Sequence, residues 1–83
     1  MTNSKKVVVY TTRYCPYCTA AKKLLESRKV SFKEVDVTDD DAMREKLVEM
    51  TGGRETVPQI FVDGKSIGGY DDLAHLYASG KGI

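Results

Sequence analysis

The sequence has no long hydrophobic run. Its longest apolar stretch is the four-residue segment Val7–Tyr10, whereas a helix needs about 20 apolar residues to cross a bilayer. The residues before it, 1–6, are polar apart from the methionine and lack the apolar segment of a signal peptide. We therefore expect neither a membrane association nor a secretory leader.

Charge of one sign is not in excess either. Thirteen Lys and Arg residues balance twelve Asp and Glu residues and leave a net charge of +1. Proteins that bind nucleic acid carry a basic surface, so this balance argues against nucleic acid as a partner. By area scaling, a chain of 83 residues buries about 63% of its unfolded surface, which suits one small core. We expect a single domain over residues 1–83.

Cysteine is scarce, because the chain has only Cys15 and Cys18. Disulfide-stapled secreted domains carry several widely spaced cysteines, and a bridge between residues this close would close almost no loop. In the reducing cytoplasm, where we expect this protein, such a pair favours redox chemistry or metal binding. A structural zinc site needs four ligands, and the remaining Cys or His is His75, on the polar side of a predicted helix. Redox chemistry is the preferred interpretation.

Hydrophobic periodicity predicts alternating strands and helices. The predicted elements are a strand at Lys6–Tyr10, a helix from Pro16 to Arg28, a strand within Val30–Val37, a helix between Thr38 and Gly52, strands at Thr56–Val62 and Lys65–Ile67, and a helix at Tyr70–Ser79. Asp63-Gly64 between the last two strands is a strong hairpin signal. The apolar phase shifts between Phe32 and Val35, so the register of that strand is not fixed. The order β-α-β-α-β-β-α predicts an α/β fold, a four-stranded mixed sheet flanked by three helices.

The second helix has a predicted start and a predicted inner face. Thr38 and Asp41 match the Thr-x-x-Asp form of a capping box. Helical spacing then directs Met43, Leu47 and Met50 inward.

Cys15-Pro-Tyr-Cys18 leaves a predicted buried strand and opens a predicted helix. Pro16 suits the first helical position, where its missing N–H is not needed. Cys15 then lies at the helix N-terminus, where free N–H groups and the helix dipole stabilise a thiolate. Cys18 lies one turn further in, close enough for a disulfide and less exposed. We expect Cys15 to attack disulfides and to be a good leaving group, and Cys18 to resolve the mixed disulfide.

Three segments, Val8–Leu24, Thr56–Val62 and Gly68–Leu73, resemble the glutaredoxin family, specifically its small dithiol class with the Cys-Pro-Tyr-Cys site. The resemblance implies a thioredoxin-like fold and a glutathione-dependent thiol–disulfide oxidoreductase. It would reduce protein–glutathione mixed disulfides through Cys15 and protein disulfides through Cys15 with Cys18. The resemblance implies glutathione as co-substrate, no tightly bound cofactor or metal, a monomer, and glutathionylated or disulfide-containing client proteins as partners.

The resemblance also implies a glutathione site beside Cys15. Pro58 is expected to be cis and to face Cys15, with Thr56 and Val57 offering backbone groups that pair with the extended ligand. On the residues alone, an ordinary trans proline at a strand start is the alternative. Tyr17 is expected to lie beside both sulfurs and to cover the glutathione backbone.

Tyr70, Asp71 and Asp72 are expected to hold the γ-glutamyl end of glutathione. Backbone N–H groups at these residues would bind its carboxylate, while an Asp side chain, preferably that of Asp72, would accept from its ammonium. Both acids are also explained as residues that favour the first turn of a helix.

The glycyl carboxylate of glutathione needs a cation, and here the sequence departs from the family. Many glutaredoxins have Lys or Arg three residues before the first cysteine, where this chain has Thr12. Arg13 is the expected substitute, with Arg44 and Arg54 as alternatives, and each is otherwise a solvated surface charge. The short tail Ser79–Ile83 is a second departure, since many relatives continue with a Leu-rich helix.

Two other functions are alternatives. A glutaredoxin-like redoxin reduced directly by thioredoxin reductase would lack the acidic turn, so Asp71 and Asp72 argue against it. A dimeric carrier of a [2Fe–2S] cluster uses one cysteine per chain together with glutathione. Pro16 and Cys18 argue against that role.

Overall fold

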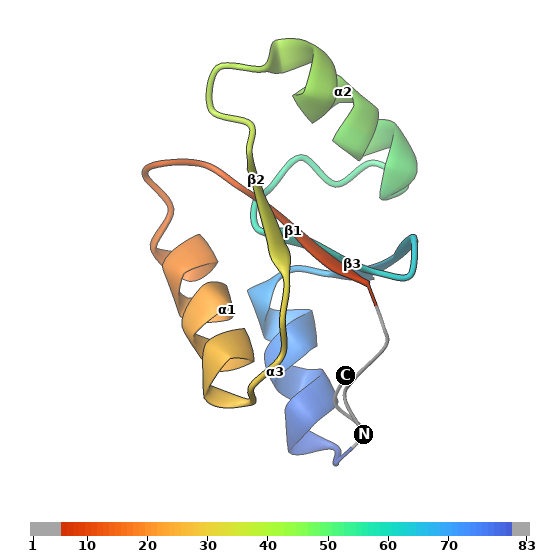
Figure 1. Ribbon diagram of the computed structural model, residues 1–83. Coiled ribbons are helices and arrows are strands. Elements are labelled where there is room, and N and C mark those ends of the chain that lie inside the picture. Colours follow the sequence, from red (N-terminus) through yellow and green to blue (C-terminus); the bar gives the residue numbers. More distant parts are fainter. Residues whose placement is uncertain (1–5, 81–83) are drawn as a thin grey trace.

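The computed structural model describes residues 6–80, and its elements follow the predicted order (Figure 1). They are β1 (Val7–Thr11), α1 (Pro16–Ser27), β2 (Lys33–Asp36), α2 (Asp41–Met50), β3 (Gln59–Val62), β4 (Lys65–Gly68) and α3 (Tyr70–Ala78). The predictions for the leader, over residues 1–5, and for the end of the tail, over residues 81–83, lie outside the described residues. Between residues 6 and 80, no helix has the length and apolar character needed to span a membrane.

The strands form one mixed sheet in the order β2-β1-β3-β4. β1 runs parallel to β2 and antiparallel to β3, while β3 and β4 form the terminal hairpin (Figure 1). The hairpin turn at Asp63 and Gly64 has φ angles of 52° and 83°, the left-handed pair that an Asp-Gly turn adopts. The predicted four-stranded mixed sheet and its hairpin are confirmed.

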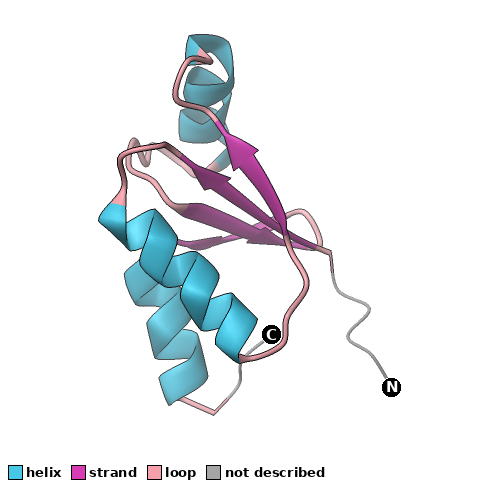
Figure 2. Ribbon diagram, turned by 60° about the vertical axis from the view of Figure 1, so that its left-hand side comes forward, coloured by secondary structure: helices cyan, strands magenta, loops and turns pink. Residues whose placement is uncertain are grey.

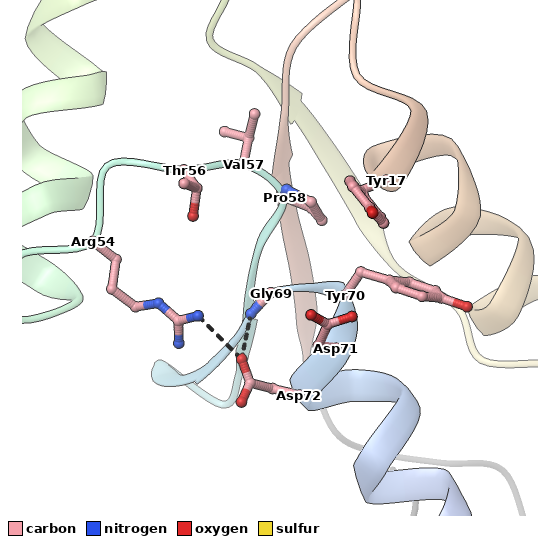
Figure 3. Close-up of a pocket in the computed structure, with 9 residues that line it drawn as sticks. All are labelled: Tyr17, Arg54, Thr56, Val57, Pro58, Gly69, Tyr70, Asp71 and Asp72. Carbon is pink, nitrogen blue, oxygen red and sulfur yellow. Dashed lines mark hydrogen bonds and ion pairs between the residues drawn. The ribbon is translucent and has the colours of Figure 1, made fainter.

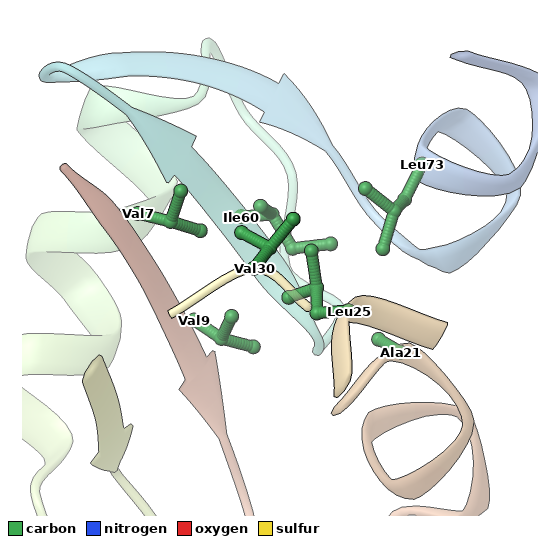
Figure 4. Close-up of a cluster of buried hydrophobic side chains, with 7 residues drawn as sticks. All are labelled: Val7, Val9, Ala21, Leu25, Val30, Ile60 and Leu73. Carbon is green, nitrogen blue, oxygen red and sulfur yellow. The ribbon is translucent and has the colours of Figure 1, made fainter. Parts of the chain in front are cut away.

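Helices α1 and α3 lie side by side on one face of the sheet, and α2 covers the other (Figure 2). The buried side chains of the first face are Val7, Val9, Ala21, Leu25, Val30, Ile60 and Leu73 (Figure 4). The second face holds Val37, Leu47 and Phe61, with Val8 and Tyr10 packed against them. Because β1 is covered on both faces, its sequence is an unbroken apolar run.

The register of β2 is defined by its pairing with β1, in which Glu34 lies opposite Val9. Phe32, just before the strand, packs against the α1 and α3 face, whereas Val35 packs against the α2 face. Three positions along an extended chain reverse the direction of a side chain. The shift in apolar phase therefore reflects burial of the two residues on opposite faces.

Helix α2 differs from the prediction at its start and at its end. Its N-cap is Asp40, whose Oδ1 accepts from a first-turn backbone N–H at 3.0 Å, so the predicted capping box at Thr38 is wrong. The hydroxyl oxygen of Thr38 instead accepts from the backbone N of Arg13 at 2.9 Å. The prediction for Met50 is also wrong, since it is 41% exposed. Helix α2 contacts the sheet through Leu47, with Met43 packed beside it, and its last two residues, Glu49 and Met50, are exposed.

Candidate active site

Cys15 is the N-cap of α1, at the end of the short turn that follows β1. Pro16 is the first residue of the helix, as predicted, and the backbone N of Cys18 donates to Sγ of Cys15 at 3.1 Å. The carbonyl oxygen of Val57 lies 3.6 Å from the same sulfur. The sulfur thus accepts an N–H bond at the positive end of α1, where a negative charge is stabilised.

Cys18 is the inner sulfur of the pair, since it is 1% exposed whereas Cys15 is only half-buried. Burial, followed by the hydrogen bond with Cys15, raises the pKa of Cys18 from 9.0 to about 12. Cys18 is therefore held as a neutral thiol, and Cys15 is the sulfur that a disulfide in solution can reach. His75, the other candidate metal ligand of the sequence, lies exposed on α3.

The loop before β3 faces this dithiol. Its Val57–Pro58 peptide bond is cis, as the resemblance implied. The side chain of Gln59 is fully buried, and its Nε2 donates to the carbonyl oxygen of Thr56 at 2.8 Å. This bond fixes the loop backbone beside Cys15. Gln59 was not predicted as a site residue, because a glutamine at a strand start gives no signal that it will be buried.

A pocket of about 260 Å³ opens between α1, this loop and the start of α3 (Figure 3). Its lining residues are Tyr17, Arg54, Thr56, Val57, Pro58, Gly69, Tyr70, Asp71 and Asp72. The fold thus brings together every residue predicted to bind glutathione except Arg13. Arg54 was predicted only as an alternative cation, and Gly69 was not predicted as a lining residue.

Two tyrosines form one wall of the pocket. Tyr17 from α1 and Tyr70 from α3 have ring centroids 6.0 Å apart and ring planes inclined by 35° (Figure 3). Tyr17 is 63% exposed, so much of its ring is available to a ligand. A flat aromatic surface of this kind can cover the apolar part of a bound molecule.

Asp72 and Arg54 form the charged side of the pocket. Oδ2 of Asp72 accepts from the backbone N of Gly69 at 3.0 Å and from Nη2 of Arg54 at 3.2 Å (Figure 3). The Gly69 N–H is the main cause of the lowered pKa of Asp72, and the Arg54 guanidinium is a further cause. Asp72 therefore caps the first turn of helix α3, where an acid is favoured, and lines the pocket as well.

The turn between β4 and α3 requires glycine at position 68. Gly68 has a φ of 109°, and a Cβ atom there would collide with the carboxylate of Asp72 and lie 2.8 Å from Nη1 of Arg54. A residue without a side chain is needed for Asp72 to reach the N–H of Gly69.

The three predicted cations lie in different places. Arg13 is outside the pocket, where it pairs with Asp39. Arg44 is exposed on α2 and is not among the lining residues. Arg54 is the one of the three that lines the pocket. The sequence favoured Arg13, which lies two residues before Cys15, but the distance of each arginine from the pocket depends on the tertiary fold and not on separation along the chain.

The fold and the site together define a class of protein. The chain has a four-stranded mixed sheet, three helices, a Cys-x-x-Cys dithiol at a helix N-terminus and a cis-proline loop facing it. This is the architecture of thioredoxin-like thiol–disulfide oxidoreductases.

Comparison with known proteins identifies the family within this class. The family model for glutaredoxin matches residues 7–67. Glutaredoxin 3 of Escherichia coli K12 is 50% identical over 74 residues, which cover 89% of this chain and 88% of that protein. Glutaredoxin 1 of Rickettsia prowazekii is 41% identical over 76 residues, which cover 90% of this chain and 80% of that protein.

Solved structures agree with this assignment. A crystal structure of a buckwheat glutaredoxin–glutathione complex has a TM-score of 0.86 and 34% identity, over 95% of this chain and 74% of that chain. Glutaredoxin 1 from Francisella tularensis has a TM-score of 0.78 and 34% identity, over 92% of this chain and 95% of that chain. The chain belongs to the glutaredoxin family and is a thiol–disulfide oxidoreductase.

Proposed function

We propose that this protein depends on glutathione and reduces protein–glutathione mixed disulfides through Cys15, and protein disulfides through Cys15 with Cys18. The observation that carries this proposal is the position of the pocket beside the attacking sulfur. Val57 supplies the carbonyl oxygen 3.6 Å from Sγ of Cys15 and also lines the pocket. Glutathione bound there would have its sulfur next to Cys15. The buckwheat relative, solved as a complex with glutathione, supports this ligand.

The γ-glutamyl end of glutathione suits the start of α3. Its carboxylate would accept hydrogen bonds from the backbone N–H groups at Tyr70, Asp71 and Asp72, which lie in the first turn of the helix. Its ammonium would donate to the Asp72 carboxylate, which the lowered pKa keeps ionised at neutral pH. Asp71 lines the same end of the pocket and adds a second negative charge.

The middle of glutathione suits the loop before β3. Residues 56–58 present an extended backbone with which the cysteinyl residue would pair as a short strand. The exposed ring of Tyr17 would cover this part of the ligand and keep it against the dithiol.

We assign the glycyl carboxylate to Arg54 rather than to Arg13. Arg54 lines the pocket, whereas Arg13 is engaged with Asp39 outside it. In the free protein Arg54 pairs with Asp72. Binding would exchange this one ion pair for two, Arg54 with the glycyl carboxylate and Asp72 with the γ-glutamyl ammonium.

The reaction is an exchange of sulfur–sulfur bonds. The Cys15 thiolate attacks the glutathione sulfur of a mixed disulfide and forms a Cys15–glutathione bond, while the client sulfur leaves as a thiolate that takes up a proton. A second glutathione thiolate then attacks the glutathione sulfur of this new bond, which releases glutathione disulfide and restores the Cys15 thiolate. With a protein disulfide, Cys15 attacks a client sulfur, Cys18 displaces the client, and two glutathione molecules reduce the resulting Cys15–Cys18 bond.

Serine variants of the two cysteines test this division of labour. Cys15→Ser should abolish both activities, because Cys15 is the sulfur at the start of α1 that substrate can reach. Cys18→Ser should keep reduction of a glutathionylated peptide and lose reduction of a protein disulfide. Both are measured as NADPH consumption coupled through glutathione reductase.

Two results would contradict the proposal. Loss of both activities in Cys18→Ser would mean that the route through one sulfur is wrong. Wild-type activity with thioredoxin reductase and NADPH, and none with glutathione, would favour the redoxin alternative.

A further inference from the structure

A chain of polar contacts joins the sheet to the helix that carries the dithiol. Nζ of Lys22 lies 2.9 Å from Oε2 of Glu34, and the Thr11 hydroxyl donates to the same oxygen at 2.8 Å. Thr11 is buried, and the buried Val9 opposite Glu34 faces α1. The carboxylate is therefore held on the α1 side of the sheet, outside the glutathione pocket.

Lys22 and Cys18 lie on the same face of α1, because they are four residues apart. Cys18 is buried, so the charge of Lys22 acts on its sulfur partly through protein, where a field is screened less than in water. Burial, followed by the hydrogen bond with Cys15, raises the pKa of Cys18, whereas a backbone hydrogen bond from Thr12 and, as the smallest of these causes, the charge of Lys22 lower it. Glu34 neutralises part of the Lys22 charge.

We propose that Lys22 is a positioning residue for the second half of the dithiol reaction. Its charge favours the thiolate of Cys18 when that sulfur attacks, and Glu34 sets how much of the charge Cys18 experiences. The inference rests on the proposed function, in which Cys18 resolves a mixed disulfide on Cys15.

The assisted step begins when Cys18 loses its proton to water. Its thiolate then attacks Sγ of Cys15 and supplies the electron pair of the new Cys15–Cys18 bond. The old bond between Cys15 and the client sulfur breaks, and its electron pair leaves with the client sulfur, which takes up a proton. Lys22 neither bonds to sulfur nor exchanges a proton, so its contribution is electrostatic.

The first step should be insensitive to Lys22. Cys15 is seven residues away, about 10 Å along the helix axis, and its sulfur accepts the backbone N–H of Cys18 at the start of α1. At that distance, on a half-exposed sulfur, the charge of Lys22 is largely screened. The two steps of one reaction should therefore respond differently to one substitution.

The test uses the aromatic disulfide dithiobis(nitrobenzoate), which reports each sulfur in turn. Attack by Cys15 releases one coloured thionitrobenzoate, and attack by Cys18 on the mixed disulfide releases a second. In stopped-flow measurements, Lys22→Met should slow the second release about three- to tenfold and leave the first unchanged. Lys23→Met is the matched control, because it removes the same charge from the adjacent, exposed position and should change neither release.

Two further variants distinguish charge from packing. Lys22→Arg keeps the charge and should restore the second release to within about twofold of the wild type. Glu34→Gln keeps an oxygen acceptor for Thr11 and Lys22 but removes the negative charge, so it should speed the second release about twofold. A purely structural role would predict slowing by Glu34→Gln, since the ion pair is lost.

Equal second-release rates in Lys22→Met and Lys23→Met would overturn the inference, as would slowing by Glu34→Gln. If Lys22→Met lowers the melting temperature and slows both releases, Glu34→Gln still separates the two explanations. A faster second release in that variant supports the effect of charge, and a slower one supports a purely structural role. The proposed function fails separately, because this assay contains no glutathione. If both releases are normal but the protein shows no turnover with glutathione, the proposed function is contradicted. The effect of Lys22 on Cys18 can still be measured in the release assay.

Discussion

At the scale of the residue, Asp72 is the side chain whose charge can be tested most directly. Asp72→Asn keeps the size and an acceptor oxygen for Gly69 but removes the ion pair with Arg54. It also removes the proposed partner of the glutathione ammonium. Both side chains of the pair are about half exposed, so we expect a moderate effect, a KM for glutathione raised about three- to tenfold.

The control for this prediction is Asp41→Asn, which removes the same charge from the first turn of α2. Asp41 does not line the pocket, so the KM for glutathione should stay unchanged. Alkylation of Cys15 by iodoacetamide should be unchanged in both variants, because neither alters the start of α1. Equal KM values for Asp72→Asn and wild type would mean that the carboxylate serves only to start α3.

The sequence predicts where the two cysteines lie but not all of the contacts around the pocket beside them. Cys15 and Cys18 were predictable because their spacing, together with Pro16, determines their place on a helix. The choice among the arginines was not predictable, since Arg54 reaches the pocket only through the approach of its loop to α3. The burial of Gln59 likewise depends on tertiary packing rather than on local sequence.

At the scale of the element, the turn from β4 into α3 gives a sharp steric prediction. Gly68→Ala would place a Cβ against the Asp72 carboxylate at a φ of 109°, so Asp72 and Arg54 must move. We expect a lower free energy of unfolding, by about 1–3 kcal/mol, and a higher KM for glutathione. Urea denaturation and steady-state kinetics measure the two effects.

Gly64→Ala separates collision from backbone strain. Gly64 also has a positive φ, of 83°, but a Cβ there would meet no atom within 4 Å. This variant should lose some stability through strain alone and keep the wild-type KM for glutathione. A raised KM in Gly64→Ala would show that the hairpin, and not the contact with Asp72, controls the pocket.

Elements whose signals are local were predicted well. The β1 run, the proline at the start of α1 and the Asp-Gly hairpin each depend on neighbouring residues, and each is confirmed. The start of α2 was wrong because Thr38 is engaged by Arg13, which lies 25 positions earlier. The inner face of α2 was only partly right, because the short contact at Leu47 does not reach Met50.

At the scale of the whole molecule, the site forms where three distant segments converge. The end of β1 and the start of α1 bring the dithiol. The loop before β3 brings the cis-proline, and the start of α3 brings the acidic turn (Figure 3). The sheet order follows from the alternation of elements, so the convergence could be expected. The ion pairs that complete it, Arg54 with Asp72 and Lys22 with Glu34, join segments whose separation the sequence does not determine.

The buried thiol of Cys18 makes the stability of the whole reduced protein depend on alkaline pH. Its pKa rises from 9.0 to about 12 on folding, mainly through burial. The folded state therefore keeps a proton that the unfolded state releases. This contribution to stability is fully present below about pH 9 and is lost as the pH rises toward 12.

Cys18→Ala isolates this effect, because the other alkaline groups are common to both proteins. Between about pH 8 and about pH 10, the reduced wild type should lose on the order of 1 kcal/mol more free energy of unfolding than the variant. Urea denaturation in the presence of a reductant measures the difference at each pH. The variant starts from lower stability, since it leaves a small cavity beneath α1, so the comparison is between slopes against pH. Parallel slopes would show that Cys18 ionises as readily in the folded protein as in the unfolded chain, and the resolving sulfur would then need no help from Lys22.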